Sequence, residues 1–181
     1  MKYFLFFLLT SISFTIGYAQ KNKTKTGPVI EDFGAVFAIE DADLLLDADK
    51  NYKVIFDVYT DANKKDQINP LINTVARFMN MHAQNGLQEN QMDIVVVLHG
   101  AASKNALSEK AFKKEFKTKH PNTELIDALV EKNVKIYLCG QSMKSKGYEH
   151  KDISESVKVS LSALTALVKY QSEGYQLINF N

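Results

Sequence analysis

The chain of 181 residues alternates between short apolar runs and longer segments whose apolar side chains recur at helical spacing. Three runs are typical of strands, because they are rich in β-branched and aromatic residues: YKVIFDVY, MDIVVVLHG and VKIYLC. The second run lacks apolar–polar alternation, which indicates a central strand covered on both faces. YQLINF, near the carboxyl end, predicts a fourth strand.

Helices are predicted between these strands. Pro70 fits the first turn of a helix that continues to Gly86, with apolar residues at three- and four-residue steps. Residues 107–119 predict a charged amphipathic helix that ends before the pair His120-Pro121. Asn122 is the candidate cap of a further helix through Glu131.

The last helix is predicted to run from Asp152 to Gly174. Asp152 and Glu155 form an acidic variant of a capping box, and Gly174 suits the position after a helix end. Five apolar residues at helical spacing would form its inward-facing stripe: Val157, Leu161, Leu164, Leu167 and Val168.

Strands that alternate with helices predict an α/β protein with a mostly parallel sheet and helices on both sides. Residues 52–181 are long enough for one domain with a single core. Residues 29–50 alternate apolar patches with acids, which we interpret as an extended arm with one short strand pair, packed on the main body. Residues 20–51 therefore form a polar segment and arm before the domain.

The first twenty residues, MKYFLFFLLTSISFTIGYAQ, have the pattern of a secretory signal peptide. Lys2 is the positive residue, an apolar stretch follows from Phe4 to Phe14, and Gly17-Tyr18-Ala19 is a small-x-small cleavage signal. The apolar run is shorter than the ~20 residues that a membrane span needs. We expect residues 1–19 to be cleaved and the protein to be periplasmic or secreted.

Charge argues against a nucleic-acid or membrane partner after cleavage. Removing Lys2 lowers Lys+Arg from 22 to 21, against 21 Asp+Glu, so the formal charge falls from +1 to zero. A neutral surface has no broad positive field for nucleic acid or anionic lipid. The lysines between 113 and 119 are interleaved with Phe112 and Phe116 at helical spacing, which is typical of a solvated helix face.

Cys139 is the only cysteine in the sequence, and it lies between the apolar run IYL and Gly140. An exported protein with one cysteine cannot form an internal disulfide. Cys139 is therefore a buried hydrophobe, an intermolecular partner or a chemically active group.

Ligands of parallel sheets collect at the carboxyl ends of the strands. His99, which follows VVVL and precedes Gly100, is predicted to lie at the same edge as Cys139. The glycine after each residue allows a sharp turn and close approach of a ligand. Backbone N–H groups and cations stabilise a thiolate. The loop after Cys139 offers both: Gly140, Gln141, Ser142, Lys144 and Lys146.

The other chemistry-bearing residues give weaker signals. His99 is the candidate proton acceptor, His150 in the loop after Cys139 is a lesser one, and His82 and His120 are interpreted as structural or exposed. No CxxC or HExxH spacing is present, so no metal site is predicted. The sequence also lacks GxGxxG after a strand, a GK[ST] loop and a GxSxG elbow, and no cofactor is expected.

Three stretches in order resemble the DsrE/DsrF-like family, the DsrE, TusD and YchN group of sulfur-relay proteins: VVVLHGAA, HPNTELIDALVEKNVKIYLCGQSMKSKGY and VSLSALTALVKYQSEGYQLINF. The resemblance covers roughly residues 52 to 181 and implies a three-layer α/β/α sandwich that assembles into trimers or hexamers. It also implies that Cys139 carries sulfur as a persulfide. Four further residues match the pattern around the site without a role to transfer: His99, Gly100, Gln141 and Ser142.

Three functions follow from these features. The leading hypothesis is an exported sulfur carrier in which Cys139 exchanges sulfur with a donor or acceptor protein, although sulfur-relay members of this type work in the cytoplasm. The alternative is a non-catalytic oligomeric module for small-ligand binding or assembly, with Cys139 buried. A thiol hydrolase ranks last, because it needs an acid to orient His99 and the sequence identifies none.

Overall fold

Five parallel strands form the centre of the protein, in the spatial order β4-β3-β2-β1-β5. The structure is a computed structural model that describes residues 23–62 and 64–180, so the predicted signal peptide, residues 1–19, lies outside the described residues. The strands are β1 (Tyr52–Val58), β2 (Met92–Leu98), β3 (Lys135–Cys139), β4 (Lys158–Ser160) and β5 (Gln176–Asn179). The predicted α/β class is confirmed.

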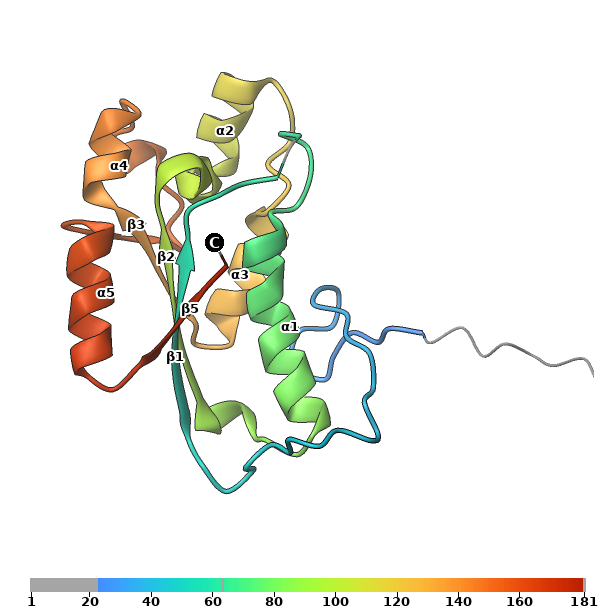
Figure 1. Cartoon of the computed structure of the whole chain (residues 1–181). Coiled ribbons are helices and arrows are strands. Elements are labelled where there is room, and N and C mark those ends of the chain that lie inside the picture. The colour runs from blue at the N-terminus through green and yellow to red at the C-terminus, as the bar shows by residue number, and fades with distance from the viewer. Residues whose placement is uncertain (1–22, 63, 181) are drawn as a thin grey trace, which may run out of the picture.

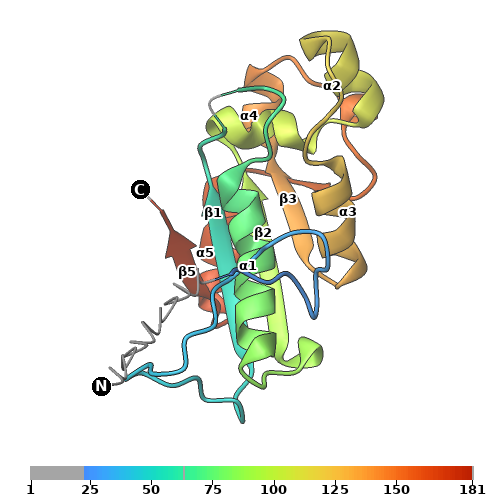
Figure 2. The ribbon, with the colours of Figure 1, turned by 90° about the vertical axis from the view of Figure 1, so that its right-hand side faces the viewer.

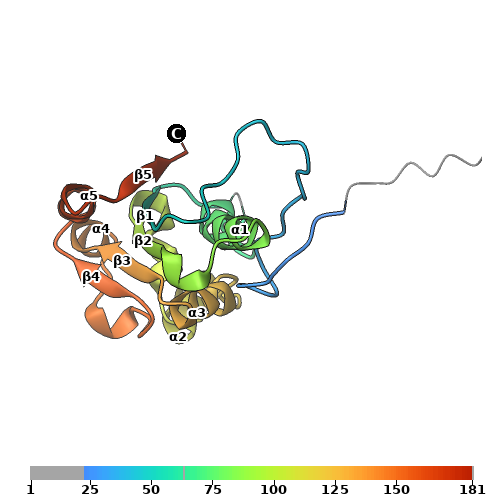
Figure 3. The ribbon, with the colours of Figure 1, turned by 90° about the horizontal axis from the view of Figure 1, so that it is seen from below.

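Helices cover both faces of the sheet. Figure 1 shows α1 and α3 on one face and α5 on the other, and Figure 3 shows the same three layers from below. The α-helices are α1 (Pro70–Gln84), α2 (Glu109–Phe116), α3 (Thr123–Glu131), α4 (Gly140–Ser145) and α5 (Ala163–Ser172), and the 3-10 helices are η1 (Glu89–Gln91), η2 (Gly100–Ala106) and η3 (His150–Asp152). Within residues 23–62 and 64–180, none of the helices is long and apolar enough to cross a membrane.

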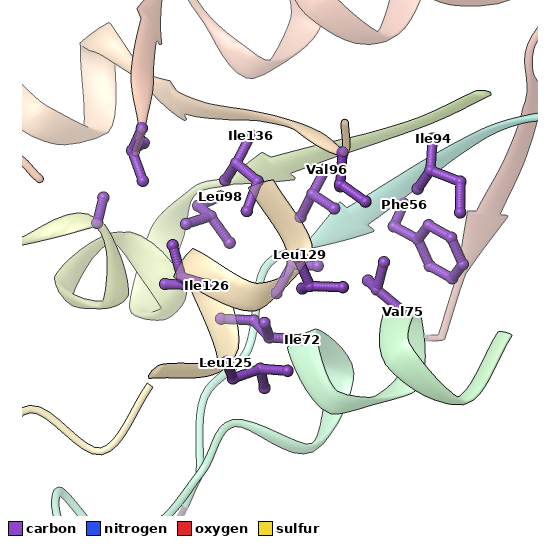
Figure 4. Packing of buried hydrophobic residues seen from close by; sticks show 14 of the residues in the cluster. Phe56, Ile72, Val75, Ile94, Val96, Leu98, Leu125, Ile126, Leu129 and Ile136 are labelled. Carbon is purple, nitrogen blue, oxygen red and sulfur yellow. The ribbon is translucent and has the colours of Figure 1, made fainter. Parts of the chain in front are cut away.

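The sheet separates two apolar clusters. The larger one fills the space between the sheet and helices α1 and α3 (Figure 4), and includes Phe56, Ile72, Val75, Ile94, Val96, Leu98, Leu125, Ile126, Leu129 and Ile136. The smaller one lies on the α5 face and includes Ile55, Val95, Val97, Cys139, Ala163, Ala166 and Tyr170. Successive residues of β2 enter opposite clusters, which confirms that this strand is covered on both faces.

The predicted helix from Asp152 to Gly174 is wrong in its first half. Residues 158–160 form β4, in which Val159 pairs with Leu138 of β3. The helix begins only after Ser162, whose side chain accepts a hydrogen bond from the N–H of Thr165 at 3.0 Å. Sheet pairing therefore overrides the helical spacing of this segment.

The predicted inward stripe of that helix largely faces outward. Helix α5 packs on the sheet through Ala163, Ala166 and Tyr170. Leu161, Leu164 and Val168 are 73%, 76% and 68% exposed, whereas Val157 is buried and Leu167 is partly buried. Small residues face the sheet because they allow close approach. Three large apolar residues are then left in contact with water.

Asn122 does not cap α3 as predicted. Its backbone is helical (φ −105°, ψ 0°), whereas a capping residue has extended backbone. Its side chain instead accepts a hydrogen bond from the N–H of Asn69 and donates one to the Asn105 side chain, both at 2.8 Å. The three asparagines are buried. They join the start of α1, η2 and the start of α3 at the carboxyl edge of the sheet.

The arm is fixed on α1 through one buried side chain. Asn80 accepts hydrogen bonds from the N–H groups of Val29 and Ile30, and donates to the carbonyls of Ile30, Phe33 and Gly34, at 2.9–3.2 Å. The predicted strand pair of the arm is reduced to a single antiparallel bridge between Lys25 and Val36. The backbone groups of the arm need no second strand here, because the Asn80 side chain supplies hydrogen-bond partners for them.

Replacing Asn80 by alanine should destabilise the protein by about 3 kcal/mol, because it leaves several buried backbone groups without partners. The free energy of unfolding, measured by urea denaturation with circular dichroism, checks this. Asn85→Ala, at the exposed end of the same helix, is the control and should cost less than about 1 kcal/mol. Equal stability of the two variants would contradict the assigned role of Asn80.

Candidate functional site

Two of the predicted site residues meet at the carboxyl edge of the sheet. Figure 2 shows β1, β2 and β3 side by side, with their carboxyl ends on the side of α4. The register pairs Leu98 with Leu138, and the extended backbone of His99 continues β2 by one residue. His99 therefore follows β2 next to Cys139, which ends β3, and both lie on the α5 face.

Cys139 occupies a junction between three elements. It is the last residue of β3, it pairs with Ser160 of β4, and it is the residue before α4. Its Sγ accepts a hydrogen bond from the N–H of Ser142 at 3.4 Å. The residue is 5% exposed, so the thiol lies at the rim of the smaller apolar cluster.

The surroundings of the thiol favour its ionised form. Burial by itself raises the pKa of Cys139, but hydrogen bonds from the side chain and N–H of Ser142 and from the N–H groups of Ala163 and Gln141 outweigh it and lower the pKa. Ala163 is the first residue of α5, so the positive end of that helix dipole acts on the sulfur. The site therefore stabilises a thiolate at lower pH than a free cysteine.

Gly140 and Ser142 hold this geometry. A Cβ on Gly140 would lie 2.6 Å from the carbonyl oxygen of Ser160, so only glycine allows the turn after Cys139 to approach β4 so closely. The Ser142 hydroxyl accepts a hydrogen bond from the N–H of Gly100 at 3.2 Å. Ser142 thus ties the turn after β2 to the turn after β3.

Gln141 and Gly100 lie beside the site, in the elements that follow β3 and β2. The Gln141 side chain is exposed and donates a long hydrogen bond, 3.5 Å, to the carbonyl of Leu161. Gly100 has φ of +56°, and a Cβ there would lie 2.4 Å from the Tyr59 ring. Gly100 therefore makes room for an aromatic ring beside the site.

His99 is paired with an acid that sequence reasoning missed. Its Nε2 lies 2.7 Å from Oδ1 of Asp57 in β1, and both side chains are largely buried. The Tyr59 ring packs beside the imidazole, with 5.2 Å between the centroids. The available signal was a charged residue inside an apolar strand, between the buried Phe56 and Val58.

The imidazole turns toward Asp57 and is not bonded to the thiol. In the part of the chain that the structure describes, His99 and Cys139 share no hydrogen bond. The polarised thiol–imidazole pair of a cysteine hydrolase is therefore not formed. The Asp57–His99 pair lies beside Cys139 as a separate hydrogen-bonded pair.

The remaining histidines do not join the site. His150 is exposed in η3, and His82 stacks on Phe78 in α1 with 3.8 Å between the rings. His120 is buried and its Nδ1 accepts a hydrogen bond from the N–H of Asn122. Lys144 and Lys146 are exposed. Among the residues described, no group of three His, Cys, Asp or Glu side chains could hold a metal ion.

Three hollows in the described part of the structure are lined without a contribution from Cys139. One of them, of about 610 Å³, lies at the opposite, amino end of β2 and β3, and is lined by Glu89, Met92, Asp93, Lys132 and Lys135, among others. Cys139 itself is 5% exposed, between the turn after β3 and the start of α5. The thiol is therefore almost fully covered by the protein and lines none of these hollows.

These features define a single parallel α/β domain with one stabilised thiolate at a strand end. The chain belongs to the DsrE/DsrF-like family, whose model matches residues 53–180, and Cys139 lies within that match. No curated protein matches the chain.

Two solved structures share the fold. The protein of unknown function MTH1491 from Methanobacterium thermoautotrophicum is 22% identical, with a TM-score of 0.54 over 72% of this chain and 100% of that chain. The ychN protein from E. coli is 16% identical, with a TM-score of 0.53 over 71% of this chain and 99% of that chain. At these identities, the two structures establish the architecture.

Ser142→Ala should raise the pKa of Cys139, because it removes the hydroxyl that supports the thiolate. Less thiolate is then present at neutral pH, and alkylation by iodoacetamide should be about threefold slower or more. The pH dependence of the alkylation rate checks this. Ser145→Ala, at the exposed end of α4, is the matched control. A pH profile unchanged by Ser142→Ala would refute the role of this serine.

Proposed function

We propose that the protein is a sulfur carrier, in which Cys139 accepts sulfane sulfur as a persulfide and passes it on. The observation that carries the proposal is the position of Cys139, which ends β3 at the carboxyl edge of the sheet next to His99 and whose Sγ accepts a hydrogen bond from the N–H of Ser142 at 3.4 Å. Burial raises the pKa of this thiol, but hydrogen bonds from Ser142, Ala163 and Gln141 outweigh it and lower the pKa. Membership of the DsrE/DsrF-like family supports a sulfur-relay type of function. The thiolate is the nucleophile that sulfur exchange needs.

The reaction is a pair of sulfur exchanges without net oxidation. The Cys139 thiolate attacks the terminal sulfur of a donor persulfide, R–S–SH; a new S–S bond forms on Cys139 as the donor S–S bond breaks. The donor leaves as a thiolate, R–S⁻, and takes a proton. An acceptor thiolate then attacks the outer sulfur of Cys139, and the Cys139 thiolate is released again. The N–H groups around Cys139 stabilise the sulfur anion at both stages.

The proton for the leaving thiolate comes from the Asp57–His99 pair in this proposal. Asp57 orients the imidazole through Nε2, as an acid does in a catalytic triad. A protonated His99 then donates to the donor thiolate as the S–S bond breaks. The adjacent strand positions of His99 and Cys139 support this role.

The setting of the site supports exchange with proteins. Cys139 is 5% exposed at the carboxyl edge of the sheet and lines none of the three hollows described above, and the formal charge is +1, so these features favour neither a small-ligand pocket nor a nucleic-acid surface. The donor and acceptor are then proteins that bring a thiol or persulfide to this edge. The amino-terminal sequence pattern supports a cleaved signal and a periplasmic or secreted location.

We also propose that the protein is a homo-oligomer, either a trimer or a hexamer. Exposed leucines and a valine on α5 support it, because a cluster of large apolar side chains on a monomer marks an interface. The burial of Cys139 favours a second candidate function, a non-catalytic binding or assembly module. In that case the thiol contributes only to packing.

Polysulfide treatment should add the mass of one sulfur atom to the protein, because the Cys139 thiolate attacks sulfane sulfur. Intact mass after alkylation of free thiols measures it, and Cys139→Ser should remove the addition. A native protein that takes up no sulfur, and is alkylated only after unfolding, would favour the binding or assembly module instead.

Asp57→Asn should slow sulfur transfer from the loaded protein to a small thiol acceptor about tenfold or more, because it removes the acid that holds the imidazole. The pH profile of the transfer rate should change as well, because the imidazole loses the carboxylate that orients it. Asp93→Asn is the control, since this acid lies on β2 and pairs with Lys135 at the other end of the sheet. Equal rates and profiles for the two variants would exclude the proton-transfer role.

A further inference from the structure

Two groups of exposed apolar side chains lie on opposite sides of the molecule. The α5 stripe consists of Leu161, Leu164 and Val168. The arm loop, residues 37–49, presents Leu44 and Leu45, which are 91% and 78% exposed, together with Phe37 and Ile39. Figures 1 and 3 show α5 on one side of the sheet and the arm beyond α1 on the other. One chain therefore cannot cover its own stripe with its own loop.

The arm loop is held at both ends. Before it, the Asn80 side chain binds the backbone of residues 29–34. At its far end, Tyr52 donates to the carbonyl of Asp47 at 3.2 Å and Gln91 donates to the carbonyl of Ala48 at 2.8 Å. Between these anchors, no hydrogen bond to residues 37–46 is found within the described ranges. Leu46 packs partly on the larger apolar cluster near the far anchor, whereas Phe37, Ile39, Leu44 and Leu45 are exposed.

The two surfaces carry charges of opposite sign. The arm loop contains five acids, Glu40, Asp41, Asp43, Asp47 and Asp49, of which Asp47 pairs with Lys50, the residue after Asp49. Residues 156–172, which include the α5 stripe, contain no acid and two lysines, Lys158 and Lys169, of which Lys169 pairs with Glu173 just after them. The exposed Lys144 and Lys146 of α4 add to the positive charge on that side. An acidic apolar loop is unsuited to an anionic membrane, but it fits an apolar stripe with lysines at its edges.

We infer that the arm loop of one copy docks on the α5 stripe of a second copy. The contact uses two different patches, so it is head-to-tail, and it closes into a ring when the rotation between copies permits. The loop lies outside residues 53–180, the part matched by the family model, so it adds a contact to the shared domain. The inference rests on the proposed homo-oligomer and is independent of the sulfur chemistry.

Disulfide cross-linking tests the pairing directly. In a Cys139→Ser background, Leu44→Cys and Val168→Cys are prepared separately and oxidised alone and as a mixture. The head-to-tail contact predicts a covalent dimer in the mixture, containing one chain of each variant, and none in either variant alone. A covalent dimer of Val168→Cys alone would indicate that two α5 helices contact each other. A covalent dimer of Leu44→Cys alone would indicate that two arm loops contact each other. Either result overturns the inference.

Met81→Cys controls for random collision, because Met81 is an exposed apolar residue of α1 outside both surfaces. Its mixture with Val168→Cys should give no dimer. The absence of a dimer in every mixture would also overturn the inference.

Sedimentation equilibrium of the full chain supplies the second test. Leu44→Asp and Leu164→Asp should each weaken association about tenfold or more, because a carboxylate is then buried against apolar groups. Met81→Asp should leave association unchanged. An oligomer unaffected by Leu44→Asp would overturn the loop contact but leave homo-oligomerisation intact. A monomeric wild-type chain would overturn both, and sulfur loading of Cys139, measured separately, would still test the carrier function.

Discussion

The close packing of Gly140 against the carbonyl of Ser160 is the contact on which the site depends. It brings the turn after β3 within reach of the turn after β4, at a separation that no other residue would allow. As a result, α5 begins beside Cys139, and the N–H of its first residue, Ala163, is one of the groups that lower the pKa of the thiol. Cys139 is also the residue before α4, from which the N–H of Ser142 donates a hydrogen bond to Sγ at 3.4 Å. Burial raises the pKa of Cys139. Among the hydrogen bonds that lower it, that of the Ser142 side chain has the largest effect, and those of the backbone N–H groups follow.

The order of strands and helices could be read from the sequence almost throughout, because most apolar runs and helical stripes reflect the two clusters that they enter. One exception is α4, which forms over Gly140–Ser145 where a loop was predicted after Cys139. The other is the segment before α5. Residues 157–168 carry apolar side chains at helical spacing, yet β4 forms there because β3 offers an edge for pairing. A three-residue strand leaves almost no local signal. Apolar residues at helical spacing are also found on the exposed side of α5, as Leu164 and Val168 show, and sequence alone cannot distinguish this from burial in the core.

The site was predictable to the extent that it depends on strand ends. Cys139 and His99 were identified because each follows an apolar run and precedes glycine, and parallel strands bring their carboxyl ends to one edge. Asp57 and Ala163 were not identified, because their positions beside the site depend on which strands are neighbours and on where α5 begins. Ala163 was missed because the last helix was predicted to begin too early in the sequence. Asp57 was missed because the pairing of β1 with β2 is a long-range contact that the sequence does not reveal.

One short segment of backbone contributes both to the surroundings of the Cys139 thiol and to the α5 stripe. Residues 160–163 contribute the strand pair of Cys139, the first exposed leucine of the α5 stripe and the N–H that stabilises the thiolate. The surface proposed for assembly and the site proposed for sulfur exchange therefore meet at these four residues. Because Leu161 lies between the strand partner of Cys139 and the first residue of α5, a second chain on the α5 stripe of the proposed homo-oligomer would lie beside the cysteine.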